Sequence, residues 1–138
     1  PAQRQARRLV GHDMGDPRPA DAFRDLRTQL LSRSRSDGLV ILVAPVRRGS
    51  GGSFVATNLA AAIALDESRV AILIDGNLRA PVLHERLGVV PERGGLVDLL
   101  EGRVEHLRGV VSPTALPRLL LVPAGDRREA SGELLASG

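Results

Sequence analysis

A run of apolar residues leads directly into a glycine-rich loop and then into a helix-forming segment. Residues 39–44 are continuously apolar and rich in β-branched side chains, which predicts a strand buried on both faces of a parallel sheet. The loop 45–53 contains Gly49, Gly51 and Gly52, and apolar residues then recur at helical spacing to about Leu65. Glycines let backbone N–H groups converge on an anion, and the start of a helix adds a positive dipole end. This order of elements is the context that a phosphate-binding loop requires.

Strand and helix patterns alternate along the rest of the chain. Residues 70–74 and 119–122 predict two further buried strands. Helices are expected at 20–32, 81–87, 96–100 and 133–136. This alternation predicts a P-loop-like α/β domain, in which helices flank a parallel sheet in three layers with right-handed crossovers.

The predicted domain occupies residues 20–138, and residues 1–19 are expected to form a flexible basic arm. The arm carries several arginines, and Pro17 and Pro19 are expected to break any helix there. We expect the domain to be incomplete, because three strands leave open sheet edges and apolar surface. Such edges favour self-association or strand exchange.

The composition removes several classes of function. No lysine is present, so every lysine-based mechanism is excluded, and the absence of cysteine excludes disulfides and thiolate metal sites. With two Phe and neither Tyr nor Trp, the chain offers no stacking platform for single-stranded nucleic acid, despite its net charge of +3. We therefore expect no nucleic-acid partner. No apolar run approaches the length of a membrane span.

The glycine-rich loop departs from the usual phosphate-binding sequence at one decisive position. Such loops end Gly-Lys-Ser/Thr, whereas this loop ends Gly51-Gly52-Ser53. The missing ammonium normally contacts the β- and γ-phosphates and offsets the charge that develops during transfer. The Gly52 N–H and the Ser53 hydroxyl remain available, the latter as a candidate Mg²⁺ ligand. Two interpretations stay open: an anion site with weak catalysis, or a strand-to-helix turn without a ligand. The candidate phosphate contacts are Gly49, Ser50, Gly51, Gly52, Ser53 and Phe54.

Arg47 and Arg48 stand at the start of the same loop. They either supply the missing positive charge or are solvated surface arginines. Asp75 follows the strand at 70–74, where a carboxylate of an open α/β sheet points into the ligand crevice and can hold Mg²⁺-bound water as a candidate catalytic and metal residue. The alternative is that Asp75 caps the segment after it. Asn77 is uncharged and cannot act as a base.

The order of these motifs resembles the bacterial tyrosine kinases that govern capsule and exopolysaccharide synthesis. Residues 21–27 resemble their Glu-Ala-Phe-Arg-x-Leu-Arg segment, and residues 51–60 resemble Gly-Lys-Ser/Thr-x-Val-Ala-x-Asn-Leu-Ala. Residues 74–81 resemble Asp-x-Asp-Leu-Arg-Arg-Pro, the second Walker-type motif of that family. Shorter matches at 83–84, 87–88, 95–100, 122–125 and 133–135 extend the likeness over residues 17–137.

The resemblance implies a cytoplasmic domain that binds ATP and Mg²⁺ and autophosphorylates on a C-terminal tyrosine cluster. It implies phosphate contacts from the loop glycines and Ser53, with Asp75 near Mg²⁺. It also implies assembly into rings through Asp21, Arg24 and Arg27, and pairing with a membrane protein that determines polysaccharide chain length. The alternative for Asp21, Arg24 and Arg27 is a solvated helix face with pairs worth about 0.2–0.5 kcal/mol each.

Several departures from the family pattern point to lost chemistry. Gly52 stands where the family has lysine, Asn77 replaces the second aspartate, and Ala80 replaces the second arginine of Leu-Arg-Arg-Pro; the chain has no tyrosine. The sequence therefore predicts a degenerate, inactive member or a fragment of one, acting as a regulator or scaffold. One alternative is an active autokinase or ATPase that uses Arg47 or Arg48. Another is a partition-type positioning ATPase, which the helix at 20–32 and the Leu-Arg-x-Pro stretch disfavour.

Overall fold

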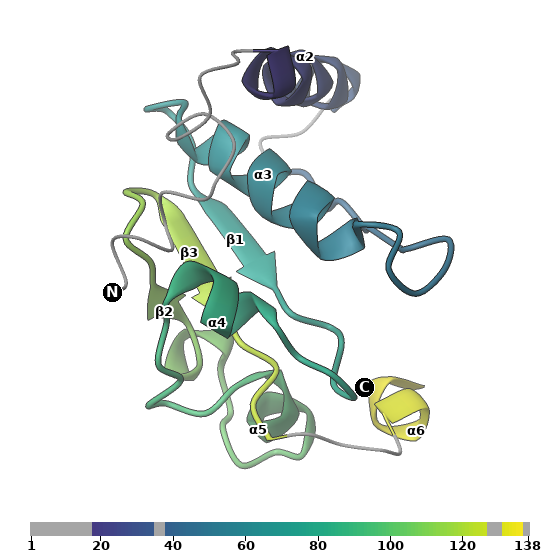
Figure 1. Ribbon diagram of the computed structural model, residues 1–138. Coiled ribbons are helices and arrows are strands. Elements are labelled where there is room, and N and C mark those ends of the chain that lie inside the picture. Colours follow the sequence, from purple (N-terminus) through teal and green to yellow (C-terminus); the bar gives the residue numbers. More distant parts are fainter. Residues whose placement is uncertain (1–17, 35–37, 127–130, 137–138) are drawn as a thin grey trace.

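The computed structural model describes residues 18–34, 38–126 and 131–136. Helices α2 (Arg18–Arg33) and α3 (Gly52–Ala64) pack against each other at one end of the molecule (Figure 1). Helices α5 (Leu96–Leu100) and α6 (Ser131–Ala136) lie at the opposite end. Residues 1–17 of the predicted arm lie outside the described residues. Pro19 belongs to the first turn of α2, where a missing N–H costs nothing, so the helix begins earlier than predicted.

Three strands form one sheet in the order β1-β3-β2. Strand β1 (Ala71–Ile74) pairs in parallel with β3 (Leu119–Val122), which confirms both of these predicted strands and their direction. Strand β2 (Ser112–Pro113) pairs antiparallel with β3 and was not predicted. It has only two residues, too few for a side-chain alternation to register in the sequence.

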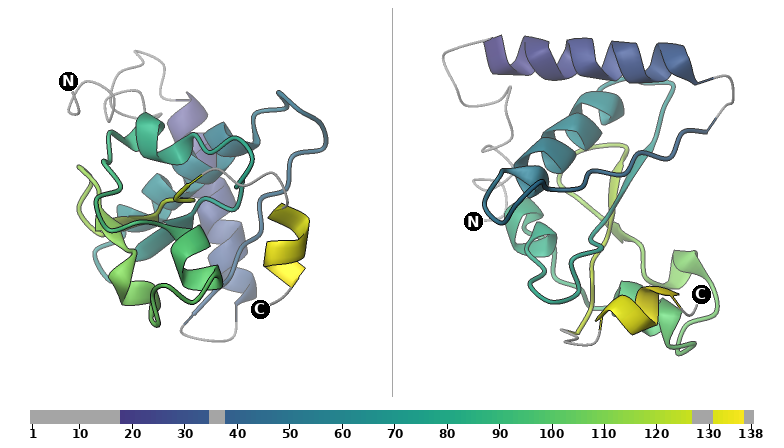
Figure 2. Two further views of the ribbon diagram at one scale, coloured as in Figure 1. Left: turned by 90° about the horizontal axis from the view of Figure 1, so that it is seen from below. Right: turned by 90° about the vertical axis from the view of Figure 1, so that its right-hand side faces the viewer.

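The strand predicted at 39–44 is wrong. This stretch has no strand hydrogen bonding and runs as a plain connection toward α3 (Figure 2). Val40 is 97% exposed and Leu42 is 88% exposed, the opposite of a doubly buried strand. The cause is a missing neighbour: an apolar run favours a strand, but the strand exists only where another strand supplies hydrogen bonds. Among the described residues, none pairs with this segment.

Helix α3 covers one face of the sheet and forms the main core with it. Its alanines come close to β1 and β3, and α4 (Leu83–Leu87) adds to the same cluster. The buried members are Ala60, Ala61, Ala64, Ala71, Leu73, Leu83, Leu87, Leu119 and Leu121. Successive side chains of a strand point to opposite faces. Ile72 and Ile74 therefore face away from α3, and they remain 47% and 48% exposed, so β1 is buried on one face only.

A second, smaller core forms around α5. Val97 packs with Leu78 and Ala124. The N–H groups of Leu96 and Val97 donate to the carbonyls of Pro123 and Ala124, at 2.7 and 3.0 Å. The backbone after β3 approaches so closely that a Cβ at Gly95 would collide with it. The short helices expected near 81–87, 96–100 and 133–136 are all present as α4, α5 and α6. Within the described part of the chain, none of the helices combines the length and apolar character required to cross a bilayer.

Candidate functional site

The glycine-rich loop forms a tight turn that ends at the start of α3. Gly49 and Gly51 adopt φ values of 80° and 87°, in the left-handed region that favours glycine. The Ser50 N–H donates to the Arg47 carbonyl at 3.1 Å, and Val55 makes the first helical hydrogen bond, to Gly51 at 2.9 Å. Gly51 provides no side-chain cap, and the first turn of α3 contains no acidic residue. The first amide N–H groups of α3 therefore point out of the helix at the positive end of its dipole, and no acidic side chain of that turn offsets this charge.

The predicted phosphate contacts are consecutive in this turn and the start of α3. Those at 49–51 are exposed, Gly52 and Ser53 are half-buried, and the Phe54 side chain is 43% exposed. Two buried polar side chains of α3 donate hydrogen bonds to carbonyl groups of its first turn. The Thr57 hydroxyl donates to the Ser53 carbonyl at 2.7 Å, and Asn58 Nδ2 donates to the Phe54 carbonyl at 2.8 Å. The sequence analysis missed this support, although two polar residues within an apolar helical pattern were a signal for it.

The local packing at Gly52 accommodates glycine better than any larger residue. A Cβ added there would lie 3.2 Å from Pro45 Cβ and 3.5 Å from Pro45 Cδ. Its backbone lies outside the left-handed region, so a side chain is hindered only by Pro45. Arg47 and Arg48, in the turn just before Gly49, are both exposed. The chain therefore presents guanidinium groups at the entrance of the loop and no ammonium within it.

Asp75 lies directly after β1 and is 3% exposed. Its Oδ1 accepts a hydrogen bond from the Asn77 N–H at 3.1 Å. Its Oδ2 accepts from the Val82 and Leu83 N–H groups, both at 3.1 Å, and so caps the start of α4. The capping role weighed as the alternative is therefore present. Oδ1, with a single partner, keeps acceptor capacity, and the predicted role near Mg²⁺ stays a prediction.

Asn77 closes the turn that follows Asp75. Its Nδ2 donates to the Ala80 carbonyl at 2.9 Å, while its Oδ1 accepts from the Ala80 N–H at 3.2 Å. Only a primary amide can make both bonds with one planar group, because an ionised carboxylate has no donor. The amide of Asn77 thus has a structural role in this turn, whereas Ala80 takes part only through its backbone.

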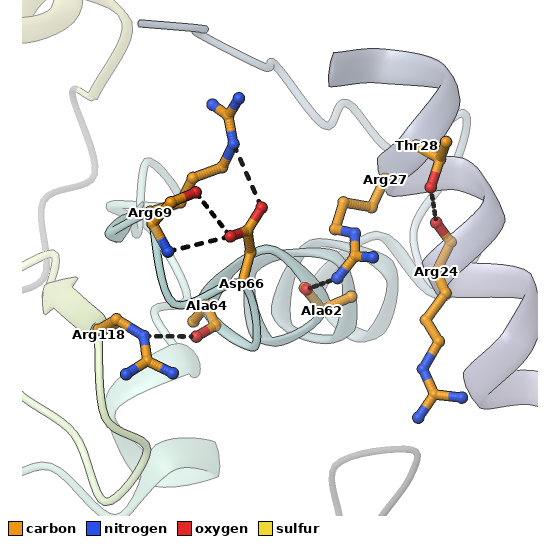
Figure 3. A network of polar contacts seen from close by, with 9 residues as sticks. Arg24, Arg27, Thr28, Ala62, Ala64, Asp66, Arg69 and Arg118 are labelled. Atoms are coloured by element: carbon orange, nitrogen blue, oxygen red, sulfur yellow. Dashed lines mark hydrogen bonds and ion pairs between the residues drawn. The ribbon is translucent and has the colours of Figure 1, made fainter. Parts of the chain in front are cut away.

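The three residues predicted to make subunit contacts are divided between two faces of α2. Asp21 and Arg24 form an exposed ion pair at 2.9 Å. Arg27 points instead toward α3, where its guanidinium donates to the Ala62 carbonyl at 2.9 Å (Figure 3). Arg118 likewise donates through Nε to the Ala64 carbonyl at 3.2 Å. Two guanidinium groups therefore satisfy carbonyls at the end of α3 and compensate the negative end of its dipole.

Two carboxylates outside the loop have lowered pKa values. The Ser68 hydroxyl, followed by the Ser68 N–H, holds the pKa of Asp66 below its ordinary value. The Gly95 N–H, at 2.7 Å from Asp98 Oδ2, is the main cause that lowers the pKa of Asp98; burial opposes it, and Arg103 reinforces it. Both groups stabilise local turns and lie outside the candidate site.

The acidic and histidine residues of the described segments do not gather into any group of three that could hold a metal ion. A shallow hollow on the surface is lined by Glu105, His106, Leu107 and Arg108, none of which belongs to the predicted site.

Comparisons with known proteins show what this chain is similar to. No protein-family model matches the chain. The putative tyrosine-protein kinase EpsB of Ralstonia solanacearum is 36% identical over 129 residues, which are 92% of this chain and 17% of the relative. The succinoglycan biosynthesis transport protein ExoP of Rhizobium meliloti is 35% identical over 124 residues, 86% of this chain and 15% of the relative. The solved kinase domain of the Escherichia coli tyrosine kinase ETK superposes with a TM-score of 0.74 at 28% identity, covering 84% of this chain and 45% of that domain.

The α/β layering and the likeness to the solved kinase domain define the class as a P-loop kinase-like domain. More narrowly, the chain is a homologue of the bacterial tyrosine-protein kinases, as its resemblance in sequence indicated. It spans less than a fifth of the full-length relatives and about half of the solved kinase domain.

Proposed function

We propose that this chain is a kinase-like regulator or scaffold in exopolysaccharide biosynthesis, with weak or no ATP turnover. The observation that carries the proposal is the loop itself, in which Gly49 and Gly51 adopt left-handed conformations just before α3 while Gly52 stands where the family has lysine. The relatives named as tyrosine kinases, and ExoP, named for succinoglycan biosynthesis, supply the biological setting. ATP with Mg²⁺ is the ligand that the loop would take.

The local packing supports weak turnover. Pro45 occupies the space next to the Gly52 Cα, and Asn77 uses both amide groups in a turn with Ala80. Asp75 has three backbone partners, which leaves only its Oδ1 with acceptor capacity for a metal-bound water. When bound, Mg²⁺ would neutralise charge on the phosphates; the chain would contribute amide N–H groups and the Ser53 hydroxyl. Protein contacts would then carry the function.

Calorimetry with Mg-ATP, combined with a phosphate-release assay, tests this proposal. We expect at most weak binding and no turnover above the background rate; micromolar binding together with turnover would overturn it. The Gly52→Lys variant should bind Mg-ATP more tightly, because it adds the ammonium, with part of the gain lost to displacement of Pro45. Gly38→Lys is the matched control: it adds the same charge at an exposed glycine with open space around it, seven residues before Pro45.

The second candidate function is an active autokinase or ATPase that uses Arg47 or Arg48. The exposure of both side chains at the entrance of the loop favours it, and a guanidinium keeps its charge and binds phosphate with two hydrogen bonds. Replacing both with glutamine should abolish any measured turnover. Turnover that persists in this variant would eliminate the candidate. A partition-type positioning ATPase remains the least favoured alternative, for the sequence reasons given above.

The proposed partner is a membrane protein that determines polysaccharide chain length, and the proposed location is the cytoplasm at the inner membrane. A scaffold that does not turn over ATP needs such a protein contact to affect polysaccharide assembly. Co-purification of the tagged chain with the membrane fraction from cells that contain or lack the chain-length protein would test this. Equal recovery of the chain from both kinds of cell would count against the proposal.

Self-association is part of the proposal, and two surfaces are available for it. The Asp21–Arg24 pair is exposed on α2, and Ile72 and Ile74 of β1 are half exposed on the face of the sheet turned away from α3. Light scattering at low and high salt separates these surfaces, because salt screens charged contacts and leaves apolar contacts intact. Arg24→Glu should abolish a salt-sensitive assembly, and Ile74→Lys a salt-insensitive one. A monomer at all concentrations and salts would refute self-association.

A further inference from the structure

The only two aromatic residues of the chain are in contact with each other, and one of them belongs to the glycine-rich loop region. Phe23 of α2 and Phe54 of α3 have ring centroids 5.9 Å apart at an interplanar angle of 66°, an edge-to-face arrangement. Phe54 directly follows Ser53 in the first turn of α3. A residue on a different helix therefore contacts the turn that presents the candidate anion site.

The start of α3 lacks the side-chain cap that usually fixes a helix N-terminus. Gly51 supplies no such bond, and Gly49 and Gly51 are the most permissive residues for backbone motion. Thr57 and Asn58 hold the carbonyls of this turn from inside the helix, but they do not fix the position of the helix relative to the rest of the protein. The packing of α3 on the sheet fixes the helix as a whole, and Phe23 adds a contact at its first turn.

A second attachment lies one turn further along α2. Phe23 and Arg27 are four residues apart and share one face of that helix. Arg27 donates to the Ala62 carbonyl, eight residues beyond Phe54 and near the end of α3 (Figure 3). The two helices thus meet at the first and the last part of α3. Two separated contacts restrict rotation and sliding, which a single contact would allow.

From this geometry we propose that α2 positions the glycine-rich loop, with Phe23 as the positioning residue at the loop end and Arg27 as the anchor at the far end. The effect of Phe23 reaches the loop through Phe54 and needs no contact with a ligand. The inference deepens the proposed function and rests on it for the identity of the loop as an anion site. The positioning itself can be measured without any ligand.

Hydrogen–deuterium exchange of the unliganded 138-residue chain tests the proposal. In Phe23→Ala, we expect the amides of residues 49–54 to exchange several-fold faster, while peptides that cover β3 remain unchanged. Arg27→Gln should instead accelerate exchange near residues 62–65. Phe23→Leu, which keeps an apolar contact, should restore most of the protection at 49–54. Thr28→Ala is the matched control, because Thr28 is an exposed residue of the same helix whose hydroxyl bonds only within α2.

Unchanged exchange at 49–54 in Phe23→Ala would overturn the proposal. A uniform acceleration over all peptides in both Phe23→Ala and Phe23→Leu would also overturn it, because it would indicate general destabilisation rather than positioning. These outcomes are independent of calorimetry with Mg-ATP on the unmodified chain. If Phe23 protects the loop from exchange but the chain binds no nucleotide, the positioning role is supported and only the proposed nucleotide ligand is refuted.

Discussion

Asn77 stands where the family has an aspartate, and the substitution Asn77→Asp restores that carboxylate. The stability of this variant tests the role of the Asn77 amide in its turn. Asn77→Asp keeps the acceptor for the Ala80 N–H but replaces the donor to the Ala80 carbonyl with a negatively charged oxygen. A hydrogen bond of this kind contributes about 0.5–1.5 kcal/mol net, and the exposed turn favours the lower half of that range. We therefore expect Asn77→Asp to lower the free energy of unfolding by about 1 kcal/mol at pH 7.

The pH dependence of this loss identifies its cause. Below about pH 3.9 the introduced carboxyl is protonated and regains an O–H donor for the Ala80 carbonyl. The difference in unfolding free energy between the parent chain and Asn77→Asp should therefore shrink in acid. Urea unfolding followed by circular dichroism at pH 7 and pH 3.5 measures it, with Asn77→Ala as the control that lacks both groups at either pH. An Asn77→Asp variant as stable as the parent at pH 7 would refute the reasoning.

Three further predictions concern residues that stabilise local structure outside the candidate site. Gly95→Ala should destabilise the chain by more than about 2 kcal/mol in urea unfolding, since its Cβ would collide with backbone near Gly125; a loss under 1 kcal/mol would contradict the close packing. Asp98 has a lowered pKa when folded, so its stabilisation is present above its unfolded pKa of about 3.9 and is lost as the pH falls through the folded value. Asp98→Asn should accordingly cost about 1.5–3 kcal/mol at pH 7 and less at pH 3, and an equal cost at both pH values would exclude the charge as the cause. Arg118 has a φ of 64°, so Arg118→Gly should be more stable than Arg118→Ala by about 1 kcal/mol, because both lose the bond to the Ala64 carbonyl but only glycine relieves the left-handed strain. Equal stability of these two variants would show that the strain is negligible.

The sequence by itself determined the local elements and the chemistry that is missing. Helical apolar spacing located α2 and α3, and short apolar runs located β1 and β3, because these patterns depend only on neighbours along the chain. The glycines of the loop were recognisable from their spacing, and Gly49 and Gly51 do adopt the conformations that require glycine. The absence of lysine was equally visible, since it is a property of composition alone.

Tertiary structure decided which of these local preferences could be satisfied and which way side chains point. Residues 39–44 have the composition of a strand but no hydrogen-bonding neighbour among the described residues, and such pairing is set by segments far away in sequence. Arg27 faces α3 because an acceptor 35 residues away lies within reach, which helical spacing alone cannot reveal. Asp75 became a cap because the chain returns to it at Leu83. Periodicity describes a residue's own element, whereas pairing, capping and burial depend on distances between elements.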